Sequence, residues 1–520
     1  MKHLLFNSIF VLTCVFSFGQ NTFNIRTSLG FPSAIYRSLN VDSNEISIVG
    51  TVIDTTPNYQ LAIIFLKVDL NGQYQQIKKF NDPVDYIAIT EPAFVKRDSF
   101  FTIGGTSIDP NGKRKVFLVK YDNHGIPIEY WKYRHPNFPQ EDFIYLSDIK
   151  FTTENSIVIS GNGTNQNGTS LDFLVLKIDS QGNEILNKLI GTIQWNEYAY
   201  KIINSGSGFI IGGLRNNTNV TTQDYTYRTL LVGIDSSGNV EWTWLSPESW
   251  GLRDAARDMV LLEDGSLVIA SGIGHEQQRP SVNVVYFDKA VFKLNPQREL
   301  EWEVVFPDPE LVMNSYTSRI IQLKNKSGFV VAGVAKRPTP PGVWGSNRGW
   351  IAKISPSGDS LWSRTYVYSA NFPSFHEFYD LKECPDGGFI LCGESRSVAN
   401  GDSIPQQAWL MKLDSFGCLV PGCQLIDATE EAQEQGTLLL YPNPARDYLN
   451  FFYRPAPGQN SRELSFRIFD ASGRELQRFE AQSGEATYIV PLWHWPPGVY
   501  FLQLLHEGLP VRTERFVVGR

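Results

Sequence analysis

The stretch that decides the fold runs from Gly208 to Trp242 and reads GFIIGG (208–213), a variable loop, then TLLVGIDSSG (229–238) and NVEW (239–242). The chain repeats this phrase seven times. The glycine that ends the first apolar run of each copy stands at Gly50, Gly105, Gly161, Gly213, Gly272, Gly333 and Gly393, with neighbours 52–61 residues apart. A period of this size with several short apolar runs is typical of repeats that stack or close radially.

A second phrase accompanies the first and marks a turn. It reads IDSSG in the fourth copy (234–238), and six of the seven copies keep its glycine; the fifth, LNPQR (294–298), does not. An Asp that hydrogen-bonds its own turn, followed by a Gly that can adopt positive φ, favours a short hairpin connection. Each copy is therefore expected to be a strand–turn–strand unit.

Each copy contains four short runs of β-forming residues. In the sixth copy these are SRIIQL (318–323), GFVVAG (328–333), GWIAKIS (349–355) and SLWSRTY (360–366). Four antiparallel strands in each of seven units predict an all-β fold, a seven-bladed β-propeller over residues 21–423.

The two ends of the array predict how the propeller closes. The seventh copy supplies only three runs, whereas the N-terminal segment TFNIRTSLG (22–30) resembles a fourth-strand phrase and precedes a first strand, IYRSLNV (35–41). We therefore expect this N-terminal strand to complete the last blade and to remove an exposed sheet edge. An open solenoid with irregular terminal units is the alternative.

The N-terminus and the composition indicate an exported protein. Residues 1–20, with Lys2 before an apolar run from Ile9 to Phe18, are typical of a secretory signal peptide; a lipoprotein signal acylated at Cys14 is the alternative. No other window approaches the length of a transmembrane helix. The net charge of −8 and the lack of a basic cluster argue against a nucleic-acid partner.

One pair of cysteines lies within a hairpin, LKECPDGGFILCG (381–393). A turn at 385–388 would pair Cys384 with Phe389 and place Cys384 and Cys392 on opposite faces of the sheet. Both are expected to be buried, unbridged apolar fillers.

The other pair, Cys418 and Cys423 in CLVPGC, stands where the last copy ends. In an exported protein these two are expected to form a disulfide that pins the end of the array, with two free thiols as the alternative. No metal site is expected, because no His or further Cys pair stands nearby at ligand spacing.

Candidate ligand-binding residues come from the start of the innermost strand of each blade. Charged residues recur there about thirteen positions before the anchor glycine: Arg37, Asp148, Lys201, Asp258, Arg319 and Asp380. They are expected to ring the mouth of the central channel, on the face that carries the long loops. A polar ligand funnel is one interpretation, and a set of ion pairs between blades is the other.

Aromatic residues of the long loops offer a second candidate surface. Trp250, Tyr316 and Trp344, with Phe372 and Phe375, could stack against a sugar or a peptide. Packing between blades is the alternative for each of them.

The C-terminal part of the chain changes character. Residues 424–437 are acidic and poor in apolar residues, which indicates an exposed linker, and residues 438–520 contain short strands typical of a small β-sandwich. Four motifs stand in this last segment: YPNP (441–444), FRIFDASGRE (466–475), PPGVYFLQL (496–504) and RFVVGR (515–520).

These motifs resemble the C-terminal sorting domain, type A, of the type IX secretion system in Bacteroidota. The resemblance places the sorting signal at Tyr441, Pro442, Asn443, Pro444, Gly473, Gly498, Tyr500 and Arg520. It implies contact with the secretion machinery and a final location that is secreted or at the outer-membrane surface. The repeats are also similar to propeller repeats common in cargo of this system, a similarity that says little about chemistry.

No catalytic motif stands out, and no cofactor is expected. The sequence has no HExxH, no GxSxG elbow and no P-loop. The first hypothesis is a non-catalytic propeller that binds an extracellular glycan or protein. The second is a carbohydrate-active hydrolase or lyase, which would need two carboxylates that converge at the channel mouth. The third is a structural surface protein.

Overall fold

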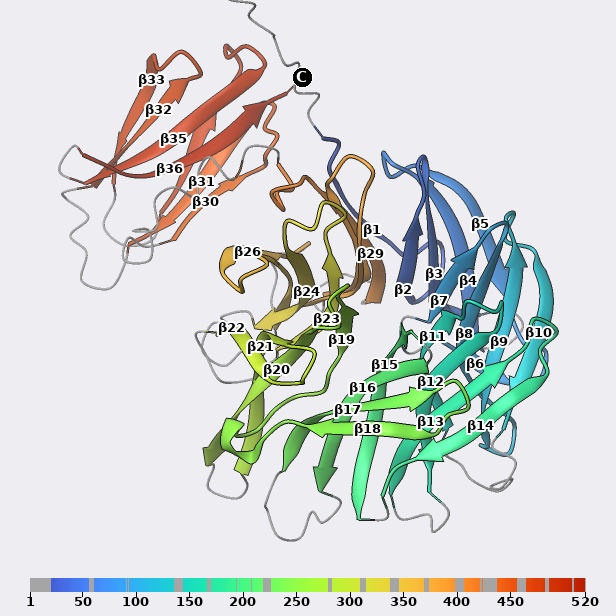
Figure 1. Cartoon of the computed structure of the whole chain (residues 1–520). Helices are drawn as coiled ribbons and strands as arrows, with labels where there is room; N and C mark the ends of the chain where they lie inside the picture. Colours follow the sequence, from blue (N-terminus) through green and yellow to red (C-terminus); the bar gives the residue numbers. More distant parts are fainter. Residues whose placement is uncertain are drawn as a thin grey trace, which may run out of the picture. The chain divides into compact units, whose positions relative to one another are not determined.

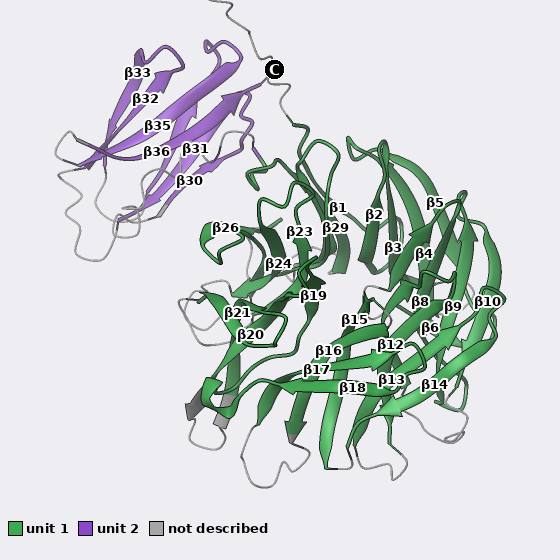
Figure 2. Ribbon diagram, viewed as in Figure 1, with its two compact units in different colours: residues 1–419 green, residues 420–520 purple. Residues whose placement is uncertain are grey.

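The computed structural model divides into two compact units, residues 1–419 and 420–520 (Figure 2). It describes residues 20–55, 60–89, 91, 93–134, 144–165, 170–192, 194–206, 208–217, 226–278, 283–308, 315–336, 346–368, 374–397, 406–420, 423, 437–455, 464–481, 486–506 and 509–519. The predicted signal peptide (1–20) and linker (424–437) lie outside these ranges, apart from Gln20 and Thr437.

The described residues of the first unit form seven antiparallel sheets, numbered here in chain order (Figure 1). Sheet one has the order β2 (Ala34–Val41), β3 (Glu45–Asp54), β4 (Gln60–Asp69), β5 (Tyr74–Phe80). Sheet two has the order β10 (Pro127–Tyr133), β9 (Arg114–Asp122), β8 (Phe100–Ile108), β6 (Tyr86–Ala88), with β7 (Phe94–Arg97) also paired to β8. Sheet three has the order β11 (Ile144–Phe151), β12 (Ile157–Thr164), β13 (Leu171–Ile178), β14 (Glu184–Ile190).

The remaining four sheets repeat this plan. Sheet four has the order β15 (Trp195–Ser205), β16 (Gly208–Asn217), β17 (Tyr227–Asp235), β18 (Val240–Leu245). The short 3-10 helix η1 (Glu248–Trp250) precedes sheet five, which has the order β19 (Asp258–Leu261), β20 (Leu267–Gln278), β21 (Asn283–Leu294), β22 (Leu300–Phe306). Sheet six has the order β23 (Tyr316–Gln322), β24 (Phe329–Lys336), β25 (Asn347–Ile354), β26 (Ser360–Tyr366). Sheet seven has the order β1 (Phe23–Thr27), β29 (Gln406–Leu413), β28 (Phe389–Ser397), β27 (Ser374–Glu383).

Successive sheets pack side by side through the strands that begin each repeat, which we call the innermost strands: β2, β6 with β7, β11, β15, β19, β23 and β27. Each contacts the neighbouring sheet, and β2 of sheet one also contacts β27, β28 and β29 of sheet seven. The first and last sheets therefore lie together although they are far apart in sequence.

The N-terminal strand lies where the sequence predicts it. Strand β1 pairs antiparallel with β29, with Phe23 opposite Lys412 and Ile25 opposite Leu410. The indole N–H of Trp409 donates a hydrogen bond to Asn24 Oδ1 at 2.6 Å. The outer edge of sheet seven is thus occupied by a strand from the other end of the unit.

Tight turns join the third and fourth strands of the repeats, as the Asp-x-x-Gly phrase predicts. In the fourth repeat, Asp235 Oδ1 accepts hydrogen bonds from the backbone N–H groups of Ser237 (2.9 Å) and Asn239 (2.8 Å), and Gly238 has φ +74°. In the fifth repeat, which lacks the glycine, Arg298 takes the same left-handed conformation with φ +68°.

The turn of one sheet packs against the outer strand of the preceding sheet. A Cβ added to Gly358 would lie 2.7 Å from the ring of Trp302, and one added to Gly417 would lie 2.6 Å from the ring of Trp362. Both positions require glycine for two reasons: the backbone has positive φ, and the indole ring lies too close for a side chain. These tryptophans therefore hold neighbouring sheets together.

The hairpin that contains Cys384 and Cys392 differs from the sequence prediction by one position. Glu383, and not Cys384, pairs with Phe389, because Cys384 is the first residue of the turn and its N–H bonds the carbonyl of Gly388. As a result both thiols face the same side and lie in one apolar cluster between sheets seven and one. Both are free and buried, whereas Cys418 and Cys423 are disulfide-bonded.

The second unit consists of two sheets that enclose one core. One has the order β30 (Thr437–Tyr441), β31 (Tyr448–Arg454), β34 (Ala486–Pro491), and the other β33 (Glu475–Glu480), β32 (Leu464–Asp470), β35 (Gly498–His506), β36 (Leu509–Val518). The rings of Phe451 and Tyr488 stack with centroids 4.5 Å apart, and Phe466 lies 5.0 Å from Phe451. Buried and exposed residues alternate in β34, as expected for a strand with one face on the core and the other in solvent.

Candidate functional site

An irregularity recurs in the innermost strands and creates the candidate site. The pairing register of β2 shifts between Tyr36 and Ser38, so that Arg37 is left out of the ladder. The same shift leaves out Ser147, Tyr200, Ser318 and Tyr379 in β11, β15, β23 and β27. A β-bulge of this kind re-aims one side chain without ending the strand.

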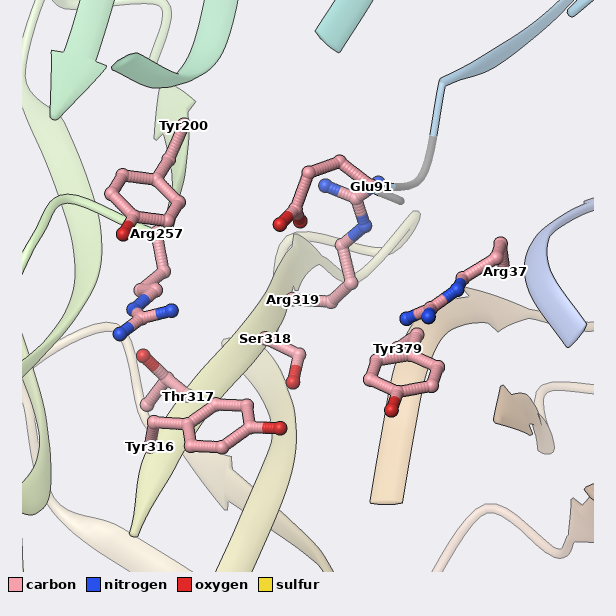
Figure 3. A pocket seen from close by; sticks show the side chains of 9 residues that line it. All are labelled: Arg37, Glu91, Tyr200, Arg257, Tyr316, Thr317, Ser318, Arg319 and Tyr379. Carbon is pink, nitrogen blue, oxygen red and sulfur yellow. The ribbon is translucent and has the colours of Figure 1, made fainter. Parts of the chain in front are cut away.

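Several of these bulged residues line a cavity of about 100 Å³ (Figure 3). The lining residues are Arg37, Glu91, Tyr200, Arg257, Tyr316, Thr317, Ser318, Arg319 and Tyr379. Glu91 stands between β6 and β7, where the innermost strand of sheet two is interrupted. Six sheets thus contribute side chains to one polar cavity: sheets one, two, four, five, six and seven.

Two tyrosines of the cavity are fixed by carboxylates, the half-buried Glu377 and the buried Glu394. The hydroxyl of Tyr316 donates to Glu377 at 2.7 Å, and the hydroxyl of Tyr379 lies 2.8 Å from Glu377 and 2.7 Å from Glu394. Burial and these acidic neighbours hold the pKa of both phenols well above its usual value. Both rings are therefore neutral, oriented walls of the cavity.

Two of the three arginines are neutralised by acids. Arg257 donates to Asp254 at 3.2 and 3.3 Å, and its guanidinium lies 4.7 Å from the centre of the Tyr200 ring. Arg319 lies 3.0 Å from Asp380. These pairs leave little net charge on that side of the cavity.

Arg37 differs from the other two. Its guanidinium lies 4.3 Å over the ring of Tyr379, its Nε is buried without a hydrogen-bond partner, and within the described ranges no carboxylate pairs with it. A cation held only by an aromatic face keeps most of its capacity to bind an anion. Figure 3 shows its guanidinium directed into the cavity.

Glu91 is the only carboxyl group among the residues that line this cavity. It has no hydrogen bond or ion pair with another described residue. Burial raises its pKa, although Arg37, Arg257 and Arg319 oppose the rise. The cavity thus presents one unpaired guanidinium and one unpaired carboxyl group.

The charged ring expected from the sequence occupies the next position along each strand and is paired internally. Lys201 lies 3.4 Å from Asp148 and 3.0 Å from Asp258. Arg319 lies 3.8 Å from Asp258 and 3.0 Å from Asp380, and Asp380 accepts hydrogen bonds from Ser38 Oγ (2.6 Å) and the N–H of Leu39 (2.9 Å). We call this set, Ser38, Asp148, Lys201, Asp258, Arg319 and Asp380, the belt.

The spacing from the anchor glycine therefore mixed two structural positions. Arg37 is a bulged residue at the cavity, whereas its sequence-predicted companions belong to the belt. Strands β2, β11, β15, β23 and β27 all carry the bulge, but the hairpins that follow differ in length, so the partner of the anchor glycine stands 14 residues before it in β2 (Tyr36) and 15 before it in β27 (Phe378). Arg319 alone touches both. The carboxylates Asp148, Asp258 and Asp380 each contact a Lys or Arg, and Lys201 contacts both Asp148 and Asp258.

The predicted aromatic surface is divided in the same way. Tyr316 lines the cavity, whereas Trp250 packs against Trp244 in sheet four and Phe292 in sheet five, with ring centroids 5.8 and 5.9 Å away. Trp344 and Phe372 lie outside the described residues. The sequence prediction missed Glu91, Tyr200, Arg257 and Tyr379 as cavity residues. The last three each stand one residue before a predicted residue, namely Lys201, Asp258 and Asp380. An alignment of the repeats that allowed for the bulge could have used this position to find them.

The comparison with protein families concerns the second unit. The family described as secretion system C-terminal sorting domain matches residues 439–519. This segment is a C-terminal sorting domain. The protein is therefore exported, and is secreted or attached at the cell surface.

Most of the sorting-signal residues have defined places in the sorting domain. Asn443 Oδ1 accepts the N–H of Val517 at 2.9 Å and its amide donates to the carbonyl of Arg515 at 3.2 Å, so the YPNP segment (441–444) is tied to β36. Gly473 forms the β32–β33 turn with φ +84°, and Gly498 begins β35. Tyr500 donates to the carbonyl of Pro496 at 2.6 Å, and Arg520 lies outside the described residues.

The other comparisons give little. No curated protein matches the chain. Similar solved structures include the polysaccharide lyase Uly1 (10% identity, 76% of this chain and 99% of that one, TM-score 0.43) and a puromycin hydrolase mutant (11%, 81% and 58%, TM-score 0.45). A Penicillium chrysogenum alpha-L-arabinanase is similar at 8% identity over 77% of this chain and 99% of that one, with a TM-score of 0.38. Likenesses this distant carry no argument about function.

The described residues lack two kinds of feature. No helix there is long and apolar enough to cross a membrane. No group of three or more His, Cys, Asp or Glu side chains there could hold a metal ion.

Proposed function

We propose that the seven sheets are the blades of a closed propeller, and that this exported protein binds an extracellular ligand without transforming it. The contacts of β2 with sheet seven and the pairing of β1 with β29 support closure. The sorting domain supports delivery of the propeller to the outside of the cell.

The ligand carries an anionic group that enters the cavity, where Arg37 binds it. This assignment depends on one observation: Arg37 is the cavity arginine that has no acidic partner in the described part of the chain. Arg37 is half-buried, and its partly desolvated charge without a counter-ion costs free energy, which an entering carboxylate or sulfate would recover. Bidentate geometry makes a guanidinium well suited to either group.

The size of the cavity limits what can enter it. About 100 Å³ holds a few waters at roughly 30 Å³ each, so a charged substituent fits but a whole sugar ring does not. We infer that an acidic glycan inserts a carboxylate or sulfate while its rings remain outside. A protein that inserts an Asp or Glu side chain would satisfy the same cavity.

The test is a binding measurement on the whole protein with acidic and neutral polysaccharides. We expect polyuronate or sulfated glycan to bind and the neutral glycan of matched backbone not to bind. Arg37→Met should weaken binding about 10- to 100-fold, the worth of a charge-assisted hydrogen bond, and Arg37→Lys should weaken it less. Arg364→Met, on the outer strand of sheet six, is the matched control. Equal binding by Arg37→Met would refute the assignment.

A second candidate function, hydrolysis or elimination on a polysaccharide, is favoured by Glu91. A carboxyl group with a raised pKa in a cavity is suited to donate a proton to a leaving oxygen. If this candidate is right, the protein releases shorter products from an acidic glycan, and Glu91→Gln abolishes release but keeps binding. Binding without product release supports the non-catalytic function.

A further inference from the structure

A second, larger cavity of about 500 Å³ lies on the other side of the belt from the first. Its lining comes from the innermost strands of all seven described sheets and continues from the belt toward the tight turns, as Asn40, Lys150, Ile203 and Lys382 indicate. Each of these stands two residues beyond its belt residue, and side chains two apart in a strand share a face. The volume is in the range of ordinary ligand sites, about 300–1,000 Å³.

The charges around this cavity do not balance. Four cations, Lys150, Lys201, Arg319 and Lys382, share three carboxylates, Asp148, Asp258 and Asp380. Lys96, which also lines the cavity, is matched by Asp42. Among these described side chains the cations therefore outnumber the carboxylates by one.

Burial and two neighbouring cations both disfavour the charged form of Lys150. Burial, together with repulsion from Lys201 and Arg319, lowers the pKa of Lys150 to about 8 even though Asp148 lies 2.9 Å away. A negative charge added to the cavity would relieve this repulsion.

The lining differs between sheets at the position two residues beyond the belt. Two residues beyond the belt, Lys150 and Lys382 come from sheets three and seven, whereas Ile203 and Ile321 come from sheets four and six. The rest of the lining is mixed, since it has apolar residues from sheets two, three and seven and cations from sheets four and six: Phe94, Val95, Phe151, Leu381, Lys201 and Arg319. A ligand that satisfies both kinds of residue at this position must have a charged end and an apolar end.

We propose that this cavity binds a monoanionic amphiphile, a carboxylate with an aliphatic or aromatic tail, independently of the first cavity. The carboxylate lies beside Lys150 and Lys382, and the tail packs against Ile203 and Ile321. One anion restores the charge balance of the ring of lysines and aspartates.

The test uses octanoate as the probe, with the full chain and isothermal titration calorimetry. We expect saturable binding of octanoate at one site per chain, and at least tenfold weaker binding of acetate, which lacks the tail, and of octanamide, which lacks the charge. Lys150→Met, which removes the excess charge, should weaken octanoate binding at least tenfold. Lys382→Gln, at a more exposed lysine, should have the same effect and serves if the first variant does not fold.

Two further variants separate this site from the other. Ile203→Ser should weaken octanoate binding, and Arg37→Met, in the first cavity, should leave it unchanged. No saturable binding, equal binding of octanamide, or loss of binding in Arg37→Met but not in Lys150→Met would each overturn the proposal.

Discussion

At the scale of single residues, the molecule tolerates ionisable groups in its interior when each has a partner, and Asp172 is an exception. Its side chain is 8% exposed, and Oδ1 has no hydrogen-bond partner. The nearby Glu197 is already bound by Arg215 at 2.6 Å and by the N–H of Thr192 at 2.8 Å. Burial and the charge of Glu197 raise the pKa of Asp172 to about 7.

This shift predicts a pH-dependent stability. Because the folded pKa is raised above the unfolded value, the folded protein binds more protons between about pH 4 and 7, and its free energy of unfolding falls as the pH rises through that window. Asp172→Asn should remove this loss and stabilise the protein by at least about 1 kcal/mol at pH 8, with no gain at pH 4.

Chemical denaturation at the two pH values measures this effect. Asp179→Asn, at an exposed turn of the same sheet, is the control and should not show the same gain at high pH. A gain from Asp172→Asn that is equal at both pH values would contradict a titration of Asp172.

For the candidate site, the sequence correctly indicated charged residues in the innermost strands, but it did not indicate which of them line the cavity. Charged residues near the start of six innermost strands were found, but the hairpins between the first and second strands differ in length. The same distance from the anchor glycine therefore reaches the bulged Arg37 in β2 and the belt residue Asp380 in β27. A bulge has no sequence signature as strong as a turn glycine, so Tyr200 and Tyr379 could not be separated from ordinary strand residues. Glu91 could not be found at all, because it interrupts a strand.

At the scale of elements, the turn glycines pack against the outer-strand tryptophans of the preceding sheet and so join neighbouring sheets. The prediction concerns Gly358, where φ is +94° and a Cβ would meet the ring of Trp302 at 2.7 Å. Gly358→Ala should destabilise the protein by about 3 kcal/mol, from the left-handed backbone and the steric overlap together.

Gly112→Ala provides a matched control. Gly112 has φ +82° but nothing within 4 Å of its Cβ position, so the substitution should cost only the backbone term of about 1 to 2 kcal/mol. Denaturant midpoints of the two variants give the comparison. Equal losses would mean that Trp302 adapts freely and does not hold sheets five and six together.

Most elements could be predicted because turn chemistry and apolar runs specify them locally. The four runs of the sixth repeat correspond to β23, β24, β25 and β26. The sequence could not indicate that the innermost strand of sheet two is broken into β6 and β7, nor the register of the Cys384 hairpin. Both depend on contacts with neighbouring sheets.

At the scale of the whole molecule, the seam between the two ends of the first unit is the place to test closure. Deletion of residues 21–27 would remove β1, expose the edge of β29, and leave the buried indole N–H of Trp409 unpaired. We expect a lower unfolding midpoint and self-association, because an uncovered strand edge pairs with another chain.

Light scattering and thermal unfolding of the deletion variant measure both effects. Asn24→Ala is the control: it removes one hydrogen bond to Trp409 but keeps the strand, and should cost about 1 to 2 kcal/mol without association. A deletion variant that stays monomeric and equally stable would argue that β1 does not secure the seam.

The repeat and the N-terminal spare strand allowed the sheet plan and the seam to be predicted, since period and turn spacing are visible in one sequence. The exported location followed from motifs in the last 80 or so residues, which match the sorting-domain family. The cavities could not be predicted, because they arise only where several sheets meet.

Acidic residues and hydrogen-bond donors alternate along the belt. Acid and donor alternate from sheet three through sheet seven to Ser38 in sheet one, which accounts for six members: Asp148, Lys201, Asp258, Arg319, Asp380 and Ser38. Two kinds of member can alternate around a circle without a mismatch only if their number is even. With seven sheets one must be the odd member, and it is sheet two, which presents Glu91 to the smaller cavity instead. In the closed propeller that we propose, the odd number of sheets thus leaves one position outside the alternating ion pairs, and the residue at that position can change without breaking the others.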